Sequence, residues 1–152
     1  MRFWRICRQR YAAEGAGGAG ARLYGGRWNS RGVSLVYASS SLALAAVETF
    51  VSLEPNLRPY DLVSIEGDIP NAVDIGRLDP ATLPVGWYQK RDESLRRFGD
   101  TWIRGGKSVA LLVPSAAISG EWNVLLNPAH PDFLKIRFRS PVRFEFDARM
   151  FR

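Results

Sequence analysis

Ser34-Leu35-Val36-Tyr37-Ala38 is a short apolar run, and Ser39-Ser40-Ser41 follows it directly. The run is typical of a short buried strand. Each of the three serines can cap the N-terminus of a helix. We expect that helix to extend to about Leu53, because Pro55 cannot continue it. The segment therefore predicts a strand that leads straight into a helix.

Strand-like patterns outnumber helical ones along the rest of the chain. They predict strands over residues 3–7, 61–69, 109–113, 134–138 and 142–146. A second helix is predicted over residues 91–104, where apolar side chains recur at helical spacing. The glycine-dense residues 14–26 and the proline-rich residues 70–86 are expected to be irregular connections. No regular βαβ alternation is present, so we expect one α+β domain over residues 1–152, with a mixed or antiparallel β core and a few helices.

The bulk composition limits the classes of function. The formal net charge of +6 raises nucleic acid as a partner. The basic residues are scattered, however, which equally suits a phosphate-handling pocket or an acidic protein partner. One cysteine, Cys7, permits no internal disulfide and favours a reducing compartment. No apolar run approaches the roughly 20 residues that span a bilayer, so we expect a cytoplasmic protein without a membrane partner.

A glycine- and arginine-rich segment precedes the predicted strand, Tyr24-Gly25-Gly26-Arg27-Trp28-Asn29-Ser30-Arg31-Gly32. Glycines let the backbone approach a ligand closely, arginines bind phosphate bidentately, and aromatic side chains stack on flat rings. The segment is typical of a site for a nucleotide-like anion. Arg27 and Arg31 could instead be solvated or pair with an acidic side chain, and the residue types alone do not decide.

Residues 15–20 formally match the dinucleotide-binding pattern G-x-G-x-x-G. That pattern needs a helix that begins at its last glycines. Residues 22–26 do not predict such a helix, so we prefer a loop here.

Glu48 is the only ionisable side chain between Ser39 and Leu53. Residues 42–47 before it are apolar on every face, which predicts a buried helix. A buried carboxylate is costly unless it is paired or functional. Two interpretations stay open: a structural ion pair with an arginine, or a carboxylate held in a pocket to stabilise positive charge.

Other catalytic chemistries find little support. The chain has one histidine, His130, and one cysteine, so we expect no metal site. A Ser-His-Asp triad would need His130, yet no Gly-x-Ser-x-Gly elbow is present. Ser115 follows a predicted buried strand and Pro114, at a place where a strand end can open into a cleft.

Together these residues resemble the RES family, the toxin components of RES–Xre toxin–antitoxin systems in bacteria. The matching segments keep their order over nearly the whole chain: 25–29, 36–48, 113–115 and 123–128. The resemblance places the family's Arg, Glu and Ser at Arg27, Glu48 and Ser115, with Tyr37 as the accompanying aromatic residue.

The resemblance implies a fold similar to ADP-ribosyltransferases and NAD as the substrate. The enzyme would break the nicotinamide–ribose bond as a glycosidase, a phosphorylase or an ADP-ribosyltransferase, with water, phosphate or a protein as acceptor. Glu48 would stabilise the cationic sugar, Arg27 would bind the pyrophosphate, Tyr37 would stack on nicotinamide and Ser115 would hold ribose or phosphate. We also expect NAD contacts from Trp28, Asn29, Arg31 and Asn123. Relatives often carry proline where Ser30-Arg31 stands here.

The resemblance also implies partners and a phenotype. We expect growth arrest, a cognate Xre-family antitoxin, a homodimer within a larger complex and, for ADP-ribose transfer, a metabolic enzyme as acceptor. A basic nucleic-acid-binding module without NAD turnover is the alternative, because residues 22–31 mix aromatic and basic side chains.

Overall fold

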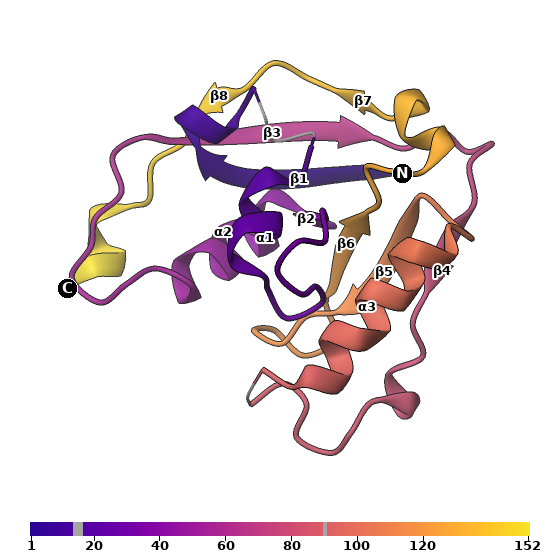
Figure 1. Cartoon of the computed structure of the whole chain (residues 1–152). Coiled ribbons are helices and arrows are strands. Elements are labelled where there is room, and N and C mark those ends of the chain that lie inside the picture. The colour runs from indigo at the N-terminus through magenta and orange to yellow at the C-terminus, as the bar shows by residue number, and fades with distance from the viewer. Residues whose placement is uncertain (14–16, 90) are drawn as a thin grey trace.

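A computed structural model describes residues 1–13, 17–89 and 91–152. Within these residues, eight strands form one sheet, with α-helices beside it (Figure 1). The helices are α1 (Ala19–Tyr24), α2 (Leu42–Val51) and α3 (Glu93–Gly105). The strands are β1 (Arg2–Arg8), β2 (Val36–Ser39), β3 (Leu62–Asp68), β4 (Ile75–Arg77), β5 (Ala110–Pro114), β6 (Trp122–Leu126), β7 (Arg137–Phe138) and β8 (Val142–Arg143).

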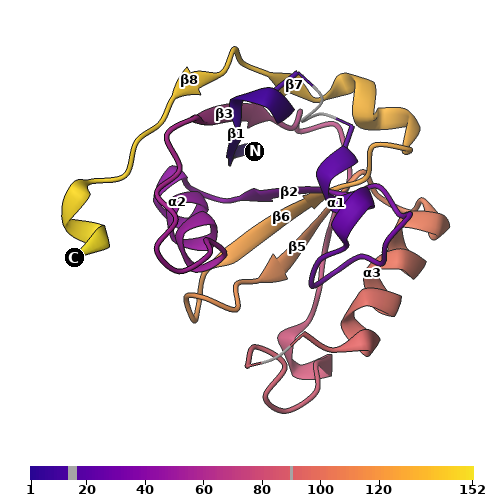
Figure 2. The ribbon, with the colours of Figure 1, turned by 60° about the vertical axis from the view of Figure 1, so that its left-hand side comes forward.

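The sheet has the strand order β4-β5-β6-β2-β1-β3-β7, and β8 also pairs with β3. β4 and β5 are parallel, whereas the other paired strands are antiparallel. The sheet curls, so that β1 and β3 run across the top of Figure 1 while β5 and β6 run steeply beneath them (Figures 1 and 2). The predicted α+β class with a mixed sheet is confirmed.

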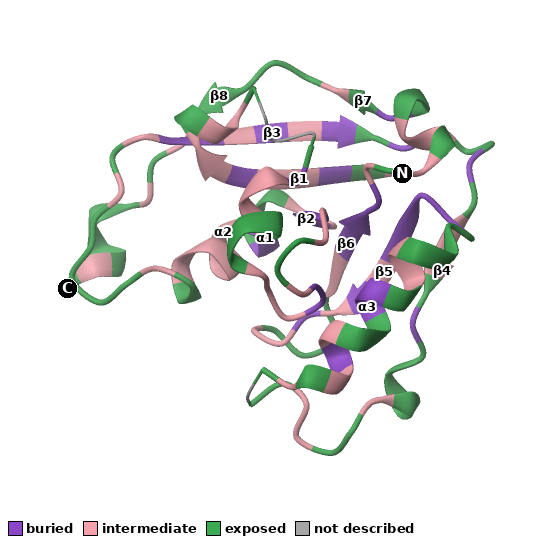
Figure 3. Ribbon diagram, in the orientation of Figure 1, coloured by how far each residue is buried: buried purple, intermediate pink, exposed green. Residues whose placement is uncertain are grey.

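Buried residues concentrate on the central strands, and α3 adds a few of its own (Figure 3). Leu111, Val113 and Leu125 alternate with residues of the opposite face and pack with Leu95 of α3. The opposite face packs a second cluster around Phe3, Val36, Ala38, Val124 and Leu126. Since strands alternate their side chains between faces, β2, β5 and β6 contribute to both clusters and are held from both sides.

The predicted strand–helix segment forms β2 and α2. Ser41 is the N-cap, and its hydroxyl accepts a hydrogen bond from the Leu44 amide at 3.1 Å. Only Leu44 and Ala45 of this helix are buried, while Val51 is 61% exposed. The prediction of a helix buried all round is therefore wrong. Alanines make the sequence apolar on each face, but only one face packs against β1 and β2.

Several local predictions need correction. We expected a loop over residues 14–26, of which residues 14–16 lie outside the described part of the chain. Within the rest, α1 forms, and it begins at the last glycines of the G-x-G-x-x-G pattern. β4 lies in the expected irregular connection, and β6 was not predicted. Residues 131–135 form a 3-10 helix, which leaves only β7 of the strand expected over residues 134–138. Among the described helices, none has the length and hydrophobicity needed to cross a membrane.

Candidate active site

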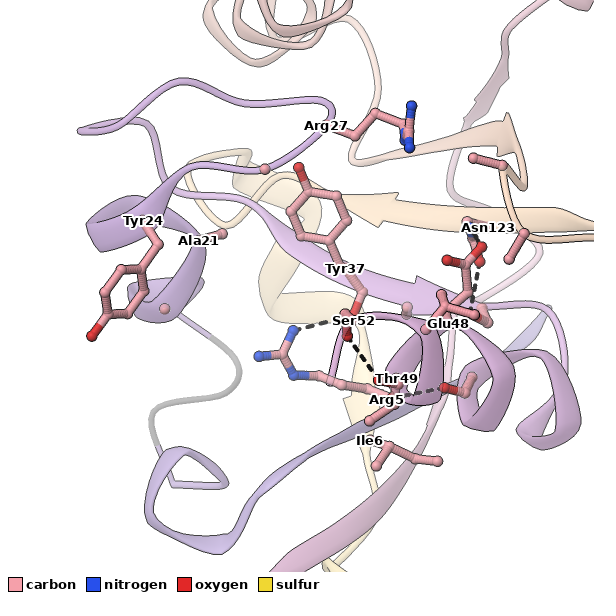
Figure 4. Close-up of a pocket in the computed structure, with 18 of the residues that line it drawn as sticks. Arg5, Ile6, Ala21, Tyr24, Arg27, Tyr37, Glu48, Thr49, Ser52 and Asn123 are labelled. Carbon is pink, nitrogen blue, oxygen red and sulfur yellow. Dashed lines mark hydrogen bonds between the residues drawn. The ribbon is translucent and has the colours of Figure 1, made fainter. Parts of the chain in front are cut away.

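A cavity of about 980 Å³ opens beside β2 and α2. This volume is near the upper end of the range of about 300–1,000 Å³ that is typical of ligand pockets. Its lining includes four residues predicted for the site, which Figure 4 shows around one space: Arg27, Tyr37, Glu48 and Asn123. The fold thus joins the loop after α1, the strand β2, the helix α2 and the strand β6 in one site.

Glu48 is held through one of its two carboxylate oxygens. The Ser115 hydroxyl donates to Oε1 at 2.6 Å, and the Asn123 amide donates to the same atom at 2.5 Å. The ion pairs among the described residues do not include Glu48. Of the two interpretations, the structural ion pair is therefore not observed. Two donors on one oxygen fix the orientation of the carboxylate.

A second set of hydrogen bonds orients both donors. The Ser39 hydroxyl donates to Asn123 Oδ1 at 2.7 Å, so the amide nitrogen of Asn123 points to Glu48. Backbone amides of Ala117 and Ile118 donate to Ser115 Oγ at 3.1 and 3.0 Å. These amides occupy the acceptor side of the hydroxyl, and its proton is directed to Glu48.

Strand register explains why these residues meet. In the antiparallel pairing of β2 with β6, Ser39 lies directly opposite Asn123. On the other side of β6, Asn123 lies opposite Val113, and the Ser115 amide donates to the Glu121 carbonyl at 2.8 Å. The neighbouring strands β2, β6 and β5 thus place Ser39, Asn123 and Ser115 next to one another at one end of the sheet, where Glu48 accepts its two hydrogen bonds.

Tyr37 is fixed through its hydroxyl. It donates to Asn29 Oδ1 at 2.7 Å and accepts from the Trp28 amide at 3.0 Å. Burial is the main reason why the pKa of Tyr37 lies well above its ordinary value. A Cβ on Gly26 would lie 2.5 Å from the hydroxyl oxygen, so glycine is needed there for Tyr37 to occupy this position.

Arg27 is half-buried and lies against Trp87, in the segment before α3 that forms one wall of the cavity. Its Nη1 donates to the Trp87 carbonyl at 2.9 Å, and its guanidinium lies 5.9 Å from the centre of the Trp87 ring. Burial lowers the pKa of Arg27, and the nearby Arg91 charge lowers it further, whereas Glu48 and Tyr37 oppose the shift. The guanidinium is therefore a partly desolvated cation that faces the same cavity as Glu48.

The structure does not bring Trp28, Asn29 or Arg31 to the cavity. Trp28 is 3% exposed and packs against the Trp87 and Phe98 rings. Asn29 is fully buried, and its amide donates to backbone carbonyls of residues 21, 30 and 33. Arg31 is exposed and is not among the lining residues. Trp28 and Asn29 shape the loop that carries Arg27, and the cavity lining does not include them.

Ser115 is another predicted site residue that the cavity lining does not include. It is 5% exposed and lies behind Glu48, outside the lining of the cavity. Its hydroxyl is already engaged with Glu48, so its position suits the support of a carboxylate rather than a grip on ribose or phosphate.

Sequence reasoning assigned no ligand contact to four residues that line the cavity: Arg5, Ser39, Tyr88 and Arg91. Tyr24, the first residue of the segment predicted to bind an anion, also lines it. Tyr24 and Tyr88 are 70% and 53% exposed, so both rings stand open to a ligand at the rim. The one local signal was that residues 87–91 repeat the mixture of aromatic and basic residues found at 24–31. The others have no distinctive neighbours in the sequence, and only the folded sheet brings them here.

Comparisons with known proteins identify the family of this chain. Residues 2–147 match the RES domain. The "Prs ADP-ribosylating toxin" of Sphingobium sp. (strain YBL2) is 40% identical over 155 residues, covering 99% of this chain and 96% of that protein. A protein named "Toxin Res" from Yersinia enterocolitica is 36% identical over 154 residues, covering 99% of both. The chain therefore belongs to the RES domain family, as the sequence motifs predict.

A solved structure is similar in fold. The M. tuberculosis MbcT-MbcA toxin-antitoxin complex contains a chain that matches with a TM-score of 0.68 and 17% sequence identity. The match covers 95% of this chain and 84% of that one. At this identity the likeness concerns the fold alone, and it supports the α+β architecture described above.

Proposed function

We propose that this protein is the toxin of a toxin–antitoxin system and that it cleaves the nicotinamide–ribose bond of NAD. The observation that carries the proposal is the geometry of Glu48, a carboxylate oriented through one oxygen in a cavity that also presents Arg27 and Tyr37. The names of the full-length relatives, which include an ADP-ribosylating toxin, support this choice.

The chemistry fits one carboxylate and no general acid. The bond between C1′ and the pyridinium nitrogen breaks, and its electron pair goes to that nitrogen, so nicotinamide leaves as a neutral molecule. The ribose is left as an oxocarbenium-like cation, as in glycoside cleavage. Glu48 Oε2, which accepts no hydrogen bond from a described residue, is the oxygen available to stabilise this charge and a ribose hydroxyl.

Arg27 and Tyr37 would position the pyrophosphate and the nicotinamide ring of NAD, which lie on either side of the ribose that reacts. Arg27 would bind the pyrophosphate, because a guanidinium donates two parallel hydrogen bonds to phosphate oxygens. The Tyr37 ring lines the cavity and its hydroxyl is occupied by Asn29 and Trp28, so the ring face is the part left for nicotinamide. Asn123 and Ser115 would act through Glu48.

The acceptor completes the reaction by adding to C1′ and losing a proton. The 40% identical relative is named for ADP-ribosylation of Prs, and this favours transfer of ADP-ribose to a protein over release to water or phosphate. We propose a metabolic enzyme as that acceptor and a cognate Xre-family antitoxin, with the toxin a homodimer in their complex. Mass spectrometry of the products formed from NAD with water alone, with phosphate and with cell lysate separates the three acceptors.

Glu48→Gln tests the proposal directly. The change keeps the size of the side chain and removes its charge, so nicotinamide release from NAD should fall by about 10²-fold or more. Glu54→Gln is the matched control, since Glu54 is exposed just beyond α2. Release is measured by chromatography, and growth arrest on expression should weaken in parallel. A wild-type protein that binds DNA or RNA with steep salt dependence and releases no nicotinamide would favour the nucleic-acid alternative instead.

A further inference from the structure

Two arginines from distant parts of the chain line the same cavity. Arg27 lies in the loop after α1, and Arg91 immediately precedes Asp92, the N-cap of α3. The sequence motifs singled out Arg27, whereas no site residue was predicted near α3. Arg27 already contacts this second segment, because its Nη1 donates to the Trp87 carbonyl at 2.9 Å.

Arg27 and Arg91 line the same cavity, and the charge of Arg91 acts on Arg27. Arg91 is, after burial, the main cause of the lowered pKa of Arg27, and its charge also acts on Tyr37. Arg91 is exposed, and the ion pairs among the described residues do not include it. Neighbouring cations that face one cavity are unfavourable in isolation and favourable once an anion lies between them.

The charges of the described lining match a dinucleotide. They comprise three positive charges from arginines and one negative charge from a glutamate. The pyrophosphate of NAD carries two negative charges, and its nicotinamide end carries a positive charge that suits Glu48. Arg5 is the third arginine, but its Nη1 donates to the Tyr37 carbonyl at 3.1 Å and so supports β2. Arg91 is the better candidate for a second ligand to phosphate.

We propose that Arg91 and Arg27 together bind the pyrophosphate of NAD, one guanidinium for each phosphate group. The inference rests on the proposed function and adds to it a selectivity for ligands that contain a diphosphate. A site with two arginines prefers compounds with a diphosphate over the corresponding monophosphates. The loop after α1 and the segment before α3, which are joined by the Arg27–Trp87 hydrogen bond, would then contact the pyrophosphate together.

The test compares the affinities of ADP-ribose, ADP and AMP for wild-type protein, Arg91→Ala and Arg97→Ala by calorimetry. Arg97 is the matched control, because it is an exposed arginine on α3 that does not line the cavity. Arg91→Ala should weaken ADP-ribose and ADP at least about tenfold and AMP much less, so the preference for ADP over AMP shrinks. Arg97→Ala should resemble the wild type, and Arg91→Lys should lie between.

The thermal midpoint separates ligand binding from a structural role. Without ligand, Arg91→Ala should melt no lower than the wild type, because a repulsion is removed, whereas the rise on adding ADP-ribose should be smaller. A lower midpoint without ligand, together with an equal loss for ADP and AMP, would overturn the inference. So would an ADP-ribose affinity equal to that of Arg97→Ala.

Two further outcomes separate the sources of failure. If wild-type protein binds neither NAD nor ADP-ribose, the proposed function fails and the role of Arg91 fails with it. If Arg91→Ala keeps its ADP-ribose affinity but no longer responds to inorganic phosphate during NAD cleavage, the arginine serves a free phosphate acceptor. That result overturns the pyrophosphate assignment while the proposed function stands.

Discussion

Asn123 could present either its oxygen or its nitrogen to Glu48, and Ser39 determines which. The Ser39 hydroxyl donates to Asn123 Oδ1, and this leaves Nδ2 to donate to the carboxylate. Ser39 is 3% exposed and does not contact Glu48 in this set of hydrogen bonds. It is therefore a positioning residue that acts through Asn123.

Ser39→Ala should lower kcat for NAD cleavage by about three- to tenfold, which corresponds to the loss of one hydrogen bond of about 0.5–1.5 kcal/mol. KM should change little, because Arg27 and Tyr37 keep their positions. Ser39→Thr should restore the rate, and Ser40→Ala is the neighbouring control. Steady-state kinetics measures both constants. Equal kcat values for the Ser39→Ala and Ser40→Ala variants would show that Asn123 needs no help from Ser39.

Tyr37 should resist ionisation at high pH. Its pKa is raised, chiefly by burial, above the value of about 10 for a free tyrosine. The folded state thus holds its proton more tightly than the unfolded state. The resulting stabilisation is complete below pH of about 10 and is lost as the pH rises above it. The protein should therefore become progressively less stable in that alkaline range.

Absorbance at 295 nm measures this ionisation. The difference between the titrations of wild type and Tyr37→Phe isolates Tyr37, and it should show a midpoint well above 10 or a step that coincides with unfolding in circular dichroism. The corresponding difference for Tyr60→Phe gives the reference for a ring that is 84% exposed. A Tyr37 midpoint at or below that reference contradicts the role of burial.

At the scale of elements, the loop that carries Arg27 packs closely against α3 at Gly99. A Cβ on Gly99 would lie 1.7 Å from the Trp28 carbonyl oxygen, so helix and loop touch backbone to backbone. The next residue, Asp100, is 5% exposed and accepts a hydrogen bond from the Ser30 amide at 2.9 Å. The wall of the cavity that carries Arg27 is therefore built on the middle of α3.

Gly99→Ala should destabilise the protein by about 3 kcal/mol, at the upper end of the cost of overpacking, because backbone cannot move as a flexible side chain does. It should also weaken NAD binding by displacing Arg27. Gly105→Ala is the control on the same helix, where an added Cβ meets nothing within 4 Å. Urea unfolding gives the free energies. Equal stabilities for the two variants would mean that the loop adjusts without cost.

The elements differ in how far the sequence predicts them. β2 and α2 were predictable because an apolar run, a serine cap and Pro55 give local signals in the right order. In α1 the same glycines that indicated a loop lie at the helix ends, where Gly18 and Gly25 have positive φ values of 69° and 70°. Glycine density therefore marked the boundaries of a helix rather than its absence.

The whole molecule explains which site residues were predictable. Arg27, Tyr37 and Glu48 lie close together in the sequence, on one loop, one strand and one helix. Ser115 was singled out at the end of a predicted strand, whereas Asn123 was identified only through the family motifs. Their meeting depends on the order β5-β6-β2, which joins strands far apart in the sequence. Arg91 lies just before α3, in a segment for which the sequence predicted no part in the site. A strand order of this kind follows from tertiary packing, which local patterns do not encode.

The C-terminal segment runs from β8 down one side of the molecule to the end marked C in Figure 1 and packs on α2. The Phe146 ring lies 5.7 Å from Phe50 of α2, 5.1 Å from Phe144 and 5.9 Å from Phe151. Arg58 adds a hydrogen bond to the Ala148 carbonyl at 3.1 Å. The last residues of the chain thus pack on the helix that carries Glu48.

Phe146→Ala should destabilise the protein by about 2 kcal/mol, less than the 3–5 kcal/mol for a fully buried phenylalanine because this ring is only partly buried. Activity should fall as well, since α2 loses one of the surfaces that fix Glu48 against Ser115 and Asn123. Leu134→Ala is the control, because it truncates an apolar side chain that is 93% exposed. Thermal unfolding and nicotinamide release are measured on the same preparations. A Phe146→Ala variant that loses stability but keeps full activity at low temperature would show that Glu48 is positioned by the sheet alone.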